Sequence, residues 1–274
     1  MDRDTLPTFF EVHEYEGLIS LPIVEHAVQA SGLSVHEVEE VALASGFLPK
    51  RYQRNRKLFS VADHLRLHRS YVALVGCGGL GGYVAEMLAR CGVGHLICID
   101  PDCFVEHNLN RQRFCTISSL GRPKVKVIAE ALRDINPSTV VFPHVEAFHI
   151  DRAADLLGPA DIVIDALDSI ESRSELAAAS RALGRPFVHG AIGGWYGQFG
   201  LQAPDSNALH QWLDDSRGKA GIEEQLGNPS FVPPLVAAIQ AAATVRILLG
   251  REDVEWGKVF FSDLQRMSFD SGIL

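Results

Sequence analysis

Residues 71–82 read YVALVGCGGLGG, an apolar run that breaks into glycines. Gly76, Gly78 and Gly81 form a Gly-x-Gly-x-x-Gly pattern, and apolar residues at helical spacing follow it. Glycines at such a turn allow a tight bend and let backbone amides approach a phosphate at the positive end of the next helix. The pattern therefore predicts a strand, a nucleotide-binding turn and a helix. A glycine turn that serves only close packing is disfavoured, because strand and helix signals flank it.

The rest of the chain continues this alternation of strands and helices. We expect a helix within 122–135 and a strongly apolar helix in VPPLVAAIQAAATVRILLG. This order favours an α/β fold with a Rossmann-like, doubly wound, mainly parallel sheet. The closing KVFFSDLQRMSFDSGIL predicts two antiparallel strands at the C-terminal edge of the sheet. The other expected strands are HLICID, TVVFPHV, ADIVIDALD, PFVHGAIG and GQFGLQA, with a helix in IESRSELAAASRALG.

Two parts of the chain stand apart from the sheet pattern. Residues 1–50 predict a small helical annex, in which Ser34 and Glu37 have the spacing of a capping box. The polar, weakly periodic residues 203–231 predict a long crossover excursion. We therefore divide the chain into the annex, 1–50, and one larger domain, 51–274.

Composition limits the classes of function. The chain of 274 residues has a net charge of −9, which disfavours a nucleic-acid partner. Its first residues lack the order of a secretory signal, and its apolar stretches are too interrupted to span a membrane. We expect a cytoplasmic protein without a membrane partner.

The five cysteines lie within 39 residues and include no Cys-x-x-Cys pair. An odd number of cysteines without a secretory signal disfavours a disulfide framework, and zinc lacks its usual paired ligands. We expect reduced thiols on or near core strands.

Acids and cations cluster after the second predicted strand, in IDPDCFVEHNLNRQRF, residues 99–114. Asp100 follows Gly81 by 19 residues, where a nucleotide fold holds an acid for a ribose hydroxyl. Hydride transfer needs little cationic charge near phosphates, whereas attack on an α-phosphate does, because negative charge develops there. Arg111 and Lys124 supply cations at the carboxyl edge of the sheet. Asp168, at the end of the DIVIDALD strand, is a candidate ligand for Mg²⁺.

Five motifs in this order resemble the ThiF/MoeB/HesA family, the adenylating core shared with ubiquitin-activating enzymes. They are RYQRN, GCGGLGG, GVGHLICIDPDCFVEHNLNRQ, GRPKV and DALDSIESR. The resemblance is firm over residues 51–200 and extends nearly to the C-terminus. It implies ATP-dependent adenylation of a carboxylate, usually the C-terminal glycine of a ubiquitin-like sulfur carrier, giving an acyl-adenylate and pyrophosphate.

The resemblance also implies roles for individual residues. Asp100 binds the ribose, Asn108, Arg111 and Lys124 contact phosphates, and Asp168 lies at Mg²⁺ and the α-phosphate. Arg54 of RYQRN is an arginine finger that reaches the nucleotide of a second subunit, so we expect a homodimer. Further residues of the matching motifs are assigned to nucleotide binding: Gly76, Gly78, Gly79, Gly81, Asp102 and Gln112.

Departures from the family pattern affect the expected partners. Many members have two Cys-x-x-Cys pairs for zinc, and this chain has none, so no zinc is expected. No cysteine follows Cys115, so residues 203–231 offer no thiol to accept the acyl group. The chain is therefore expected to stop at the adenylate and to leave sulfur transfer to a separate donor protein.

Three other functions are weighed against sulfur-carrier activation. Adenylation of a small-molecule or tRNA-linked carboxylate, as in threonylcarbamoyladenosine dehydratase relatives, ranks second. A scaffold that only binds ATP is disfavoured, because Arg111, Lys124 and Asp168 are all present. An NAD-dependent oxidoreductase is also disfavoured, because hydride transfer gives no role to the polar and cationic residues of NLNRQ and GRPK.

Overall fold

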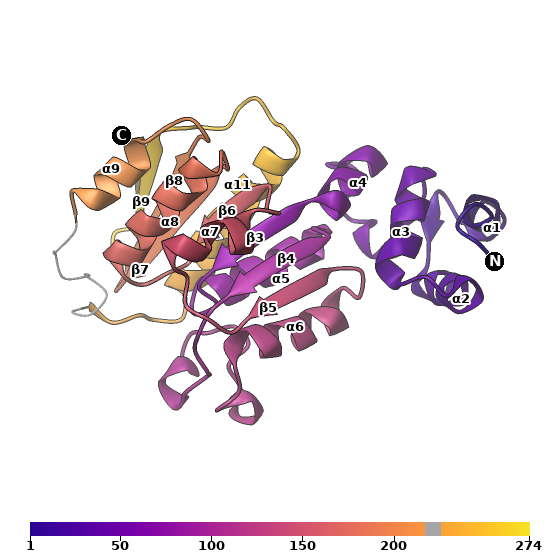
Figure 1. Ribbon diagram of the computed structural model, residues 1–274, viewed down its shortest axis with the longest axis horizontal. Helices are drawn as coiled ribbons and strands as arrows, with labels where there is room; N and C mark the ends of the chain where they lie inside the picture. The colour runs from indigo at the N-terminus through magenta and orange to yellow at the C-terminus, as the bar shows by residue number, and fades with distance from the viewer. Residues whose placement is uncertain (217–225) are drawn as a thin grey trace.

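The computed structural model describes residues 1–216 and 226–274, and within them an eight-stranded sheet forms the centre of the molecule (Figure 1). Its strand order is β10-β9-β8-β7-β6-β3-β4-β5. The strands are β3 (Tyr71–Val75), β4 (His95–Ile99), β5 (Val140–His144), β6 (Ile162–Asp165), β7 (Phe187–Gly193), β8 (Tyr196–Gln202), β9 (Lys258–Asp263) and β10 (Ser268–Ile273).

Strands β3 to β7 pair in parallel, and β8, β9 and β10 continue the sheet as antiparallel strands. Strand β3 has β4 on one side and β6 on the other, so the strand order reverses there. Ligands of doubly wound sheets bind at this switch point, outside the carboxyl ends of the strands. The predicted Rossmann-like sheet with antiparallel C-terminal edge strands is confirmed.

Helices cover both faces of the sheet. One face packs against α5 (Gly81–Cys91), α6 (Lys124–Ile135) and α11 (Val232–Leu248). The other packs against α7 (Ala153–Leu157), α8 (Ile170–Ala182) and α9 (Ala208–Asp214). Successive residues of a strand point to opposite faces, so Leu74 of β3 belongs to the first core and Val75 to the second.

Local sequence signals account for the helix ends. Ser34 caps α3 (Val35–Ala44), and Glu37 completes the predicted capping box. Helix α5 ends before Gly92, whose φ of +95° is the left-handed conformation that glycine adopts without strain.

The position of Asp168 differs from the prediction, which places it at the end of a strand. Strand β6 ends at Asp165, and Asp168 lies three residues further on, in the loop that follows.

Residues 1–50 pack around a core of their own. Helix α1 (Leu6–His13) packs with α2 (Leu21–Ser31) and α3, and the two-residue strands β1 (Leu18–Ile19) and β2 (Leu48–Pro49) pair in parallel. The capping-box spacing at Ser34 predicts the start of α3, whereas α1 is not predicted, because a helical stretch of eight residues gives little periodic signal. Figure 1 shows the annex beside α4 (Val61–Arg69), which leads into β3.

Tyr52 fixes the segment after the annex to the amino edge of the sheet. Its side chain is buried, and its hydroxyl oxygen accepts a hydrogen bond from Asn136 Nδ2 at 2.8 Å. A Cβ atom at Gly92 would lie 3.1 Å from the Tyr52 ring. Gly92 follows α5 and Asn136 follows α6, where each helix returns to the amino end of the next strand. The RYQRN motif, 51–55, therefore lies at the edge opposite the carboxyl ends of β3 and β4.

The excursion at 203–231 contains helix α9, which packs on α8 and β8. Residues 217–225 of that excursion lie outside the described residues. Within the two described ranges, no helix is long and apolar enough to cross a membrane.

All five cysteines are free thiols. Cys77, Cys98 and Cys115 are buried, in agreement with the expectation of core thiols. Cys103 is exposed, which corrects that expectation, because the loop after β4 carries it away from the core.

Candidate functional site

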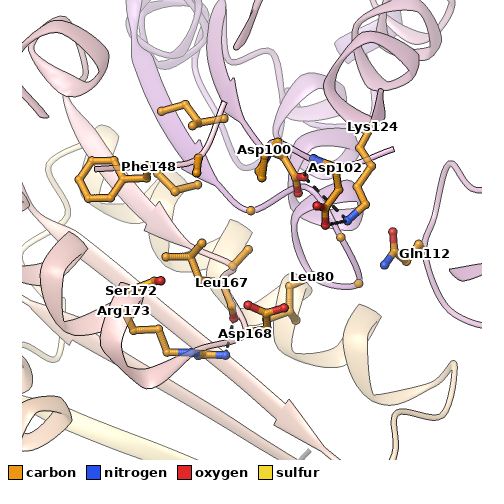
Figure 2. A pocket seen from close by; sticks show the side chains of 18 of the residues that line it. Leu80, Asp100, Asp102, Gln112, Lys124, Phe148, Leu167, Asp168, Ser172 and Arg173 are labelled. Carbon is orange, nitrogen blue, oxygen red and sulfur yellow. Dashed lines mark hydrogen bonds and ion pairs between the residues drawn. The ribbon is translucent and has the colours of Figure 1, made fainter. Parts of the chain in front are cut away.

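A cavity of about 340 Å³ opens at the carboxyl ends of β3, β4 and β6 (Figure 2). This volume is typical of small-molecule sites in proteins. Its wall is formed by the glycine turn, the loops after β4 and β6, and the start of α6. The expected site residues in this wall are Gly76, Gly78, Gly79, Asp100, Asp102, Arg111, Gln112, Lys124 and Asp168.

The glycines of the turn divide into two groups. Gly76 has φ +90°, and a Cβ atom there would lie 2.4 Å from the Ala166 carbonyl oxygen. A Cβ atom at Gly81 would lie 2.0 Å from the Gly76 carbonyl oxygen, so Gly81 serves close packing behind the cavity wall. Gly78 and Gly79 line the cavity itself. The turn thus needs glycine both for packing and for an open approach to the backbone.

Asp100 joins the glycine turn to the loop after β4. Its Oδ2 atom accepts a hydrogen bond from Cys77 N at 2.7 Å, and its Oδ1 atom accepts one from Asp102 N at 2.8 Å. Burial raises the pKa of the Asp100 carboxyl, and the nearby Lys124 ammonium group acts in the opposite direction. The carboxylate lines the cavity where the sequence predicts a ribose contact.

Lys124 is the first residue of α6, and its side chain is nearly buried. Its Nζ atom lies 2.8 Å from Asp102 Oδ2 and 3.8 Å from Asp100 Oδ1. Figure 2 shows these three side chains together on one side of the cavity. An ammonium group held between two acids inside a cavity is positioned to meet a phosphate oxygen.

The NLNRQ loop contributes Arg111 and Gln112 to the cavity. Arg111 Nη1 donates to the His107 carbonyl oxygen at 3.1 Å and to Asn110 Oδ1 at 2.8 Å. Gln112 is buried, and its Oε1 atom has no hydrogen-bond partner among the described residues. An unpaired buried acceptor beside the glycine turn is an atom that an N–H or O–H donor of a bound ligand would satisfy.

Asn108 lies behind the cavity wall. It is 4% exposed, and its Oδ1 atom accepts a hydrogen bond from Val105 N at 3.0 Å. This bond closes the short helical turn Glu106–Asn108 that carries the loop. In this conformation the side chain supports the NLNRQ loop and is not part of the cavity lining.

Asp168 faces the cavity from the side opposite Lys124 (Figure 2). The loop that carries it is held through Leu167. Asp165 Oδ1 accepts a hydrogen bond from Leu167 N at 2.9 Å, and Arg173 donates one to the Leu167 carbonyl oxygen. Both peptide groups of Leu167 are therefore fixed immediately before Asp168.

Arg54 is exposed and lies with Tyr52 at the amino edge of the sheet. The five residues of β3 separate that edge from the glycine turn, a span of roughly 16 Å at the rise of a strand. Arg54 is accordingly not in the lining of this chain's own cavity.

Sequence reasoning assigns no role to three further lining residues, Phe148, Ser172 and Arg173. Arg173 stands in the DALDSIESR motif, so the motif pointed to it without indicating its function. Phe148 follows β5 by four residues, and only the position of β5 beside β4 brings it to the cavity.

The residues present fit ATP and Mg²⁺. Gly78 and Gly79 leave the backbone open to phosphates, and Lys124 and Arg111 supply positive charge. Gln112 Oε1, which has no partner among the described residues, can accept from an N–H or O–H group of a nucleotide. Mg²⁺ is commonly held by one or two carboxylates together with phosphate oxygens, and Asp168 is such a carboxylate. Among the residues that the structure describes, no group of three or more His, Cys, Asp or Glu side chains is arranged to hold a metal ion by itself.

Comparison with known proteins identifies relatives. The family model described as "ThiF family" matches residues 52–271. The adenylyltransferase and sulfurtransferase MOCS3 of Arabidopsis thaliana is 33% identical, over 72% of this chain and 44% of that protein. The SAMP-activating enzyme E1 of Haloferax volcanii is 32% identical, over 75% of this chain and 77% of that protein. A sulfur carrier protein adenylyltransferase of Thermus thermophilus is 30% identical, over 80% and 84%.

The chain spans about half the length of the MOCS3 relatives that it matches. Solved structures with lower identity agree in fold. Escherichia coli MccB with ATP has a TM-score of 0.66 and 22% identity, over 91% of this chain and 82% of that chain. E. coli tRNA N6-threonylcarbamoyladenosine dehydratase with ATP has a TM-score of 0.64 and 23% identity, over 74% and 95%. Because the family model covers well over half of the sequence, this chain belongs to the ThiF family.

Proposed function

We propose that this protein adenylates a carboxylate with ATP, and that the carboxylate is the C-terminal glycine of a ubiquitin-like sulfur-carrier protein. One observation carries the proposal: cationic and acidic side chains face each other across a glycine-lined cavity, with Lys124 on one side and Asp168 on the other. The relatives named as a SAMP-activating enzyme and as a sulfur carrier protein adenylyltransferase support it.

In the proposed reaction, a carboxylate oxygen of the acceptor attacks the α-phosphorus of ATP. A new bond forms between that oxygen and phosphorus, and the bond from the α-phosphorus to the bridging oxygen breaks. The products are an acyl-adenylate and pyrophosphate. The incoming carboxylate is itself the nucleophile, so the protein has to position the reactants and stabilise developing negative charge.

The scheme gives roles to the polar residues that the sequence assigns to the site and to two glycines of the turn. Asp100 accepts from the ribose, and the amides at Gly78 and Gly79 approach the phosphates. Lys124 and Arg111 stabilise negative charge on the phosphates, and Gln112 offers its amide to the nucleotide. We assign Asn108 to phosphate contact through the loop that it supports, and Asp102 to holding Lys124. Mg²⁺, held by Asp168, would neutralise charge on the phosphate oxygens.

We further propose a homodimer in which Arg54 completes the partner's site. The position of Arg54 at the amino edge, away from its own cavity, supports this arrangement. A separate protein would then supply sulfur, because no cysteine follows Cys115. The cytoplasm, which provides ATP and keeps thiols reduced, is the compartment we propose.

Adenylation of a small-molecule or tRNA-linked carboxylate is the second candidate. It is favoured by the structural similarity to E. coli tRNA N6-threonylcarbamoyladenosine dehydratase, which was solved with ATP. It ranks below carrier activation, because the relatives that are 30% or more identical over most of their own length are named for carrier activation.

ATP–pyrophosphate exchange tests the proposal. The purified protein is incubated with ATP, Mg²⁺, labelled pyrophosphate and carrier proteins that end in Gly-Gly. Exchange that depends on the carrier, and that disappears when its last glycine is removed, is the expected result. Exchange with a small carboxylate alone would establish the second candidate. No exchange with any acceptor, together with tight NADH binding, would overturn both.

A further inference from the structure

A chain of three polar side chains, two of them buried and the third half-buried, crosses three neighbouring strands behind the cavity. Asp165 ends β6, His189 is its paired residue in β7, and Gln198 lies in β8. His189 Nδ1 lies 2.6 Å from Asp165 Oδ2, and His189 Nε2 lies 2.8 Å from Gln198 Nε2. Asp165 and His189 are both fully buried. The sequence reasoning for the site uses none of these three residues.

The distances define the state of the histidine. Asp165 Oδ2 can only accept from His189 Nδ1, so the proton lies on Nδ1. Gln198 Nε2 can only donate, so His189 Nε2 accepts. These two bonds describe a neutral imidazole, and burial lowers the pKa of His189 in agreement with that state. Gln198 thereby selects the tautomer that keeps a donor directed at Asp165.

Asp165 connects this chain of side chains to the cavity. Its other oxygen accepts from Leu167 N, and Arg173 lies 3.7 Å from Oδ2 while donating to the carbonyl oxygens of Leu167 and Gly190. Gln240 of α11 donates to the Asp165 carbonyl oxygen at 2.8 Å. The carboxylate of Asp165 therefore has a single orientation in which all these bonds form.

We propose that His189 is a positioning residue: through Asp165 and Leu167 it sets the place of the Asp168 carboxylate in the cavity. This inference rests on the proposed adenylation and adds a residue to it that touches neither nucleotide nor acceptor. Without the Nδ1–H donor, Asp165 is free to rotate toward Arg173, and the Leu167 amide loses its acceptor. Asp168 then occupies a range of positions, which costs rate because catalytic groups act within narrow limits of geometry.

Two amide substitutions separate this role from simple loss of a buried side chain. An Asn at position 189 places its amide nitrogen near the Nδ1 position, so His189→Asn keeps the donor to Asp165. A Gln places its nitrogen near the Nε2 position, so His189→Gln removes that donor. His189→Ala removes both. Ser180→Ala is the control for loss of a buried hydrogen bond. Ser180 is fully buried and donates to the Arg185 carbonyl oxygen, and it lies in α8 beyond Ser172 and Arg173, the residues of that helix that line the cavity.

Exchange rates, KM for ATP and the Mg²⁺ concentration for half-maximal rate are measured with the full-length variants, beside their melting temperatures. We expect His189→Gln and His189→Ala to lower kcat about tenfold or more and to raise the Mg²⁺ requirement, with KM for ATP within about threefold. His189→Asn should retain kcat within about threefold. Ser180→Ala should lower the melting temperature while kcat of the folded protein stays unchanged.

Equal loss of kcat in the Asn and Gln variants would overturn the proposal, as would unchanged kcat in the Gln variant. If His189→Ala does not fold, the comparison of Asn with Gln decides alone. An inactive wild-type protein would instead contradict the proposed adenylation. In that case the Mg²⁺ dependence of ATP binding, measured by calorimetry, still tests the positioning of Asp168. An identical Mg²⁺ dependence in the Asn and Gln variants would show that His189 does not position Asp168.

Discussion

The Lys124 ammonium group lies 2.8 Å from the Asp102 carboxylate, although 22 positions separate the two residues in the sequence. Asp102 is the counterion of Lys124 in this conformation, and a bound phosphate would compete for the same cation. Lys124 is nearly buried and Asp102 is exposed, so Asp102 is the partner that can turn away. Exchange of one anion for another keeps the buried charge of Lys124 compensated throughout.

Lys124→Ala should lower kcat for ATP–pyrophosphate exchange about 100-fold, because one charged donor to a developing oxyanion contributes rate factors of this order. Lys126→Ala is the control: it lies in the same helix, is exposed and is outside the cavity lining. Steady-state exchange kinetics measure both. Equal effects of the two substitutions would contradict the role of Lys124.

Asp168→Asn should also lower kcat about 100-fold, and should raise the Mg²⁺ concentration required, because an amide is a weaker ligand for Mg²⁺ than a carboxylate. Glu171→Gln removes an exposed acid three residues later and should leave both quantities unchanged. Titration of the exchange rate with Mg²⁺ provides the measurement. An unaltered Mg²⁺ requirement in Asp168→Asn would show that another group holds the ion.

Arg54 is tested by complementation between subunits. Arg54→Ala and Lys124→Ala are each expected to lose most of the activity, but a mixed dimer has one site with Lys124 from one chain and Arg54 from the other. Equal mixing should restore roughly a quarter of the wild-type rate, because about half of the dimers are mixed and each has one intact site. If native mass spectrometry finds mixed dimers without any activity, Arg54 does not act across an interface.

Gly78→Ala and Gly81→Ala should separate binding from stability. A Cβ atom at Gly81 would lie 2.0 Å from backbone oxygen, so Gly81→Ala should destabilise the fold by about 1–3 kcal/mol or more. At Gly78 the nearest atom is Gln112 Nε2, at 3.3 Å, and a side chain can shift. Gly78→Ala should therefore keep its melting temperature and weaken ATP binding, measured by calorimetry. Weaker ATP binding in Gly81→Ala together with a lower melting temperature in Gly78→Ala would contradict the placement of the nucleotide beside Gly78.

Acid should weaken the fold through buried histidines. Burial lowers the pKa of His64 to about 4 and that of His68 to about 3, from an ordinary value of 6.5. Below pH 6.5 the unfolded chain takes up these protons before the folded protein does. The free energy of unfolding should therefore be fully present above pH 6.5 and fall as the pH drops toward 4, by up to about 1.4 kcal/mol per pH unit for each imidazole.

Urea unfolding at several pH values measures this loss. His64 stacks on Tyr52 at 4.7 Å between ring centroids, and neither ring nitrogen has a hydrogen-bond partner among the described residues. His64→Phe should keep the stacking and reduce the pH dependence. The exposed His149 gives the control, His149→Phe, which should leave the slope unchanged. A slope that is the same in all three proteins would place the acid sensitivity elsewhere.

Much of the fold is predictable from local signals, because buried strands and capped helices carry their pattern in neighbouring residues. Strands β3 and β4, helix α5 with Gly92 and the capping box at Ser34 all follow in this way. The sequence predicts neither helix α1 nor the short α7 and α9, since helices of five to eight residues have little periodicity. Their position depends on packing against other elements.

The site is predictable only where its residues follow a strand directly. Asp100 and the glycine turn meet this condition, and the structure brings them together. Neither the bond between Asp165 and His189 nor the position of Phe148 can be read from the sequence. Both depend on which strands are neighbours, and the order of strands in a sheet is not encoded by spacing along the chain.

In the proposed ATP complex, the hydrogen bond from Cys77 N to Asp100 would couple binding of the ribose to binding of the phosphates. The proposed ribose hydroxyl would donate a hydrogen bond to the Asp100 carboxylate. The same carboxylate accepts from Cys77 N and so holds the glycine turn that would lie beneath the phosphates. Adenosine and triphosphate should therefore each bind weakly as separate molecules, so that the sum of their binding free energies is less favourable than the binding free energy of intact ATP. Fragments that contact only Asp100 or only the glycine turn would therefore be poor starting points for an inhibitor. A linked compound that contacts both would bind more tightly.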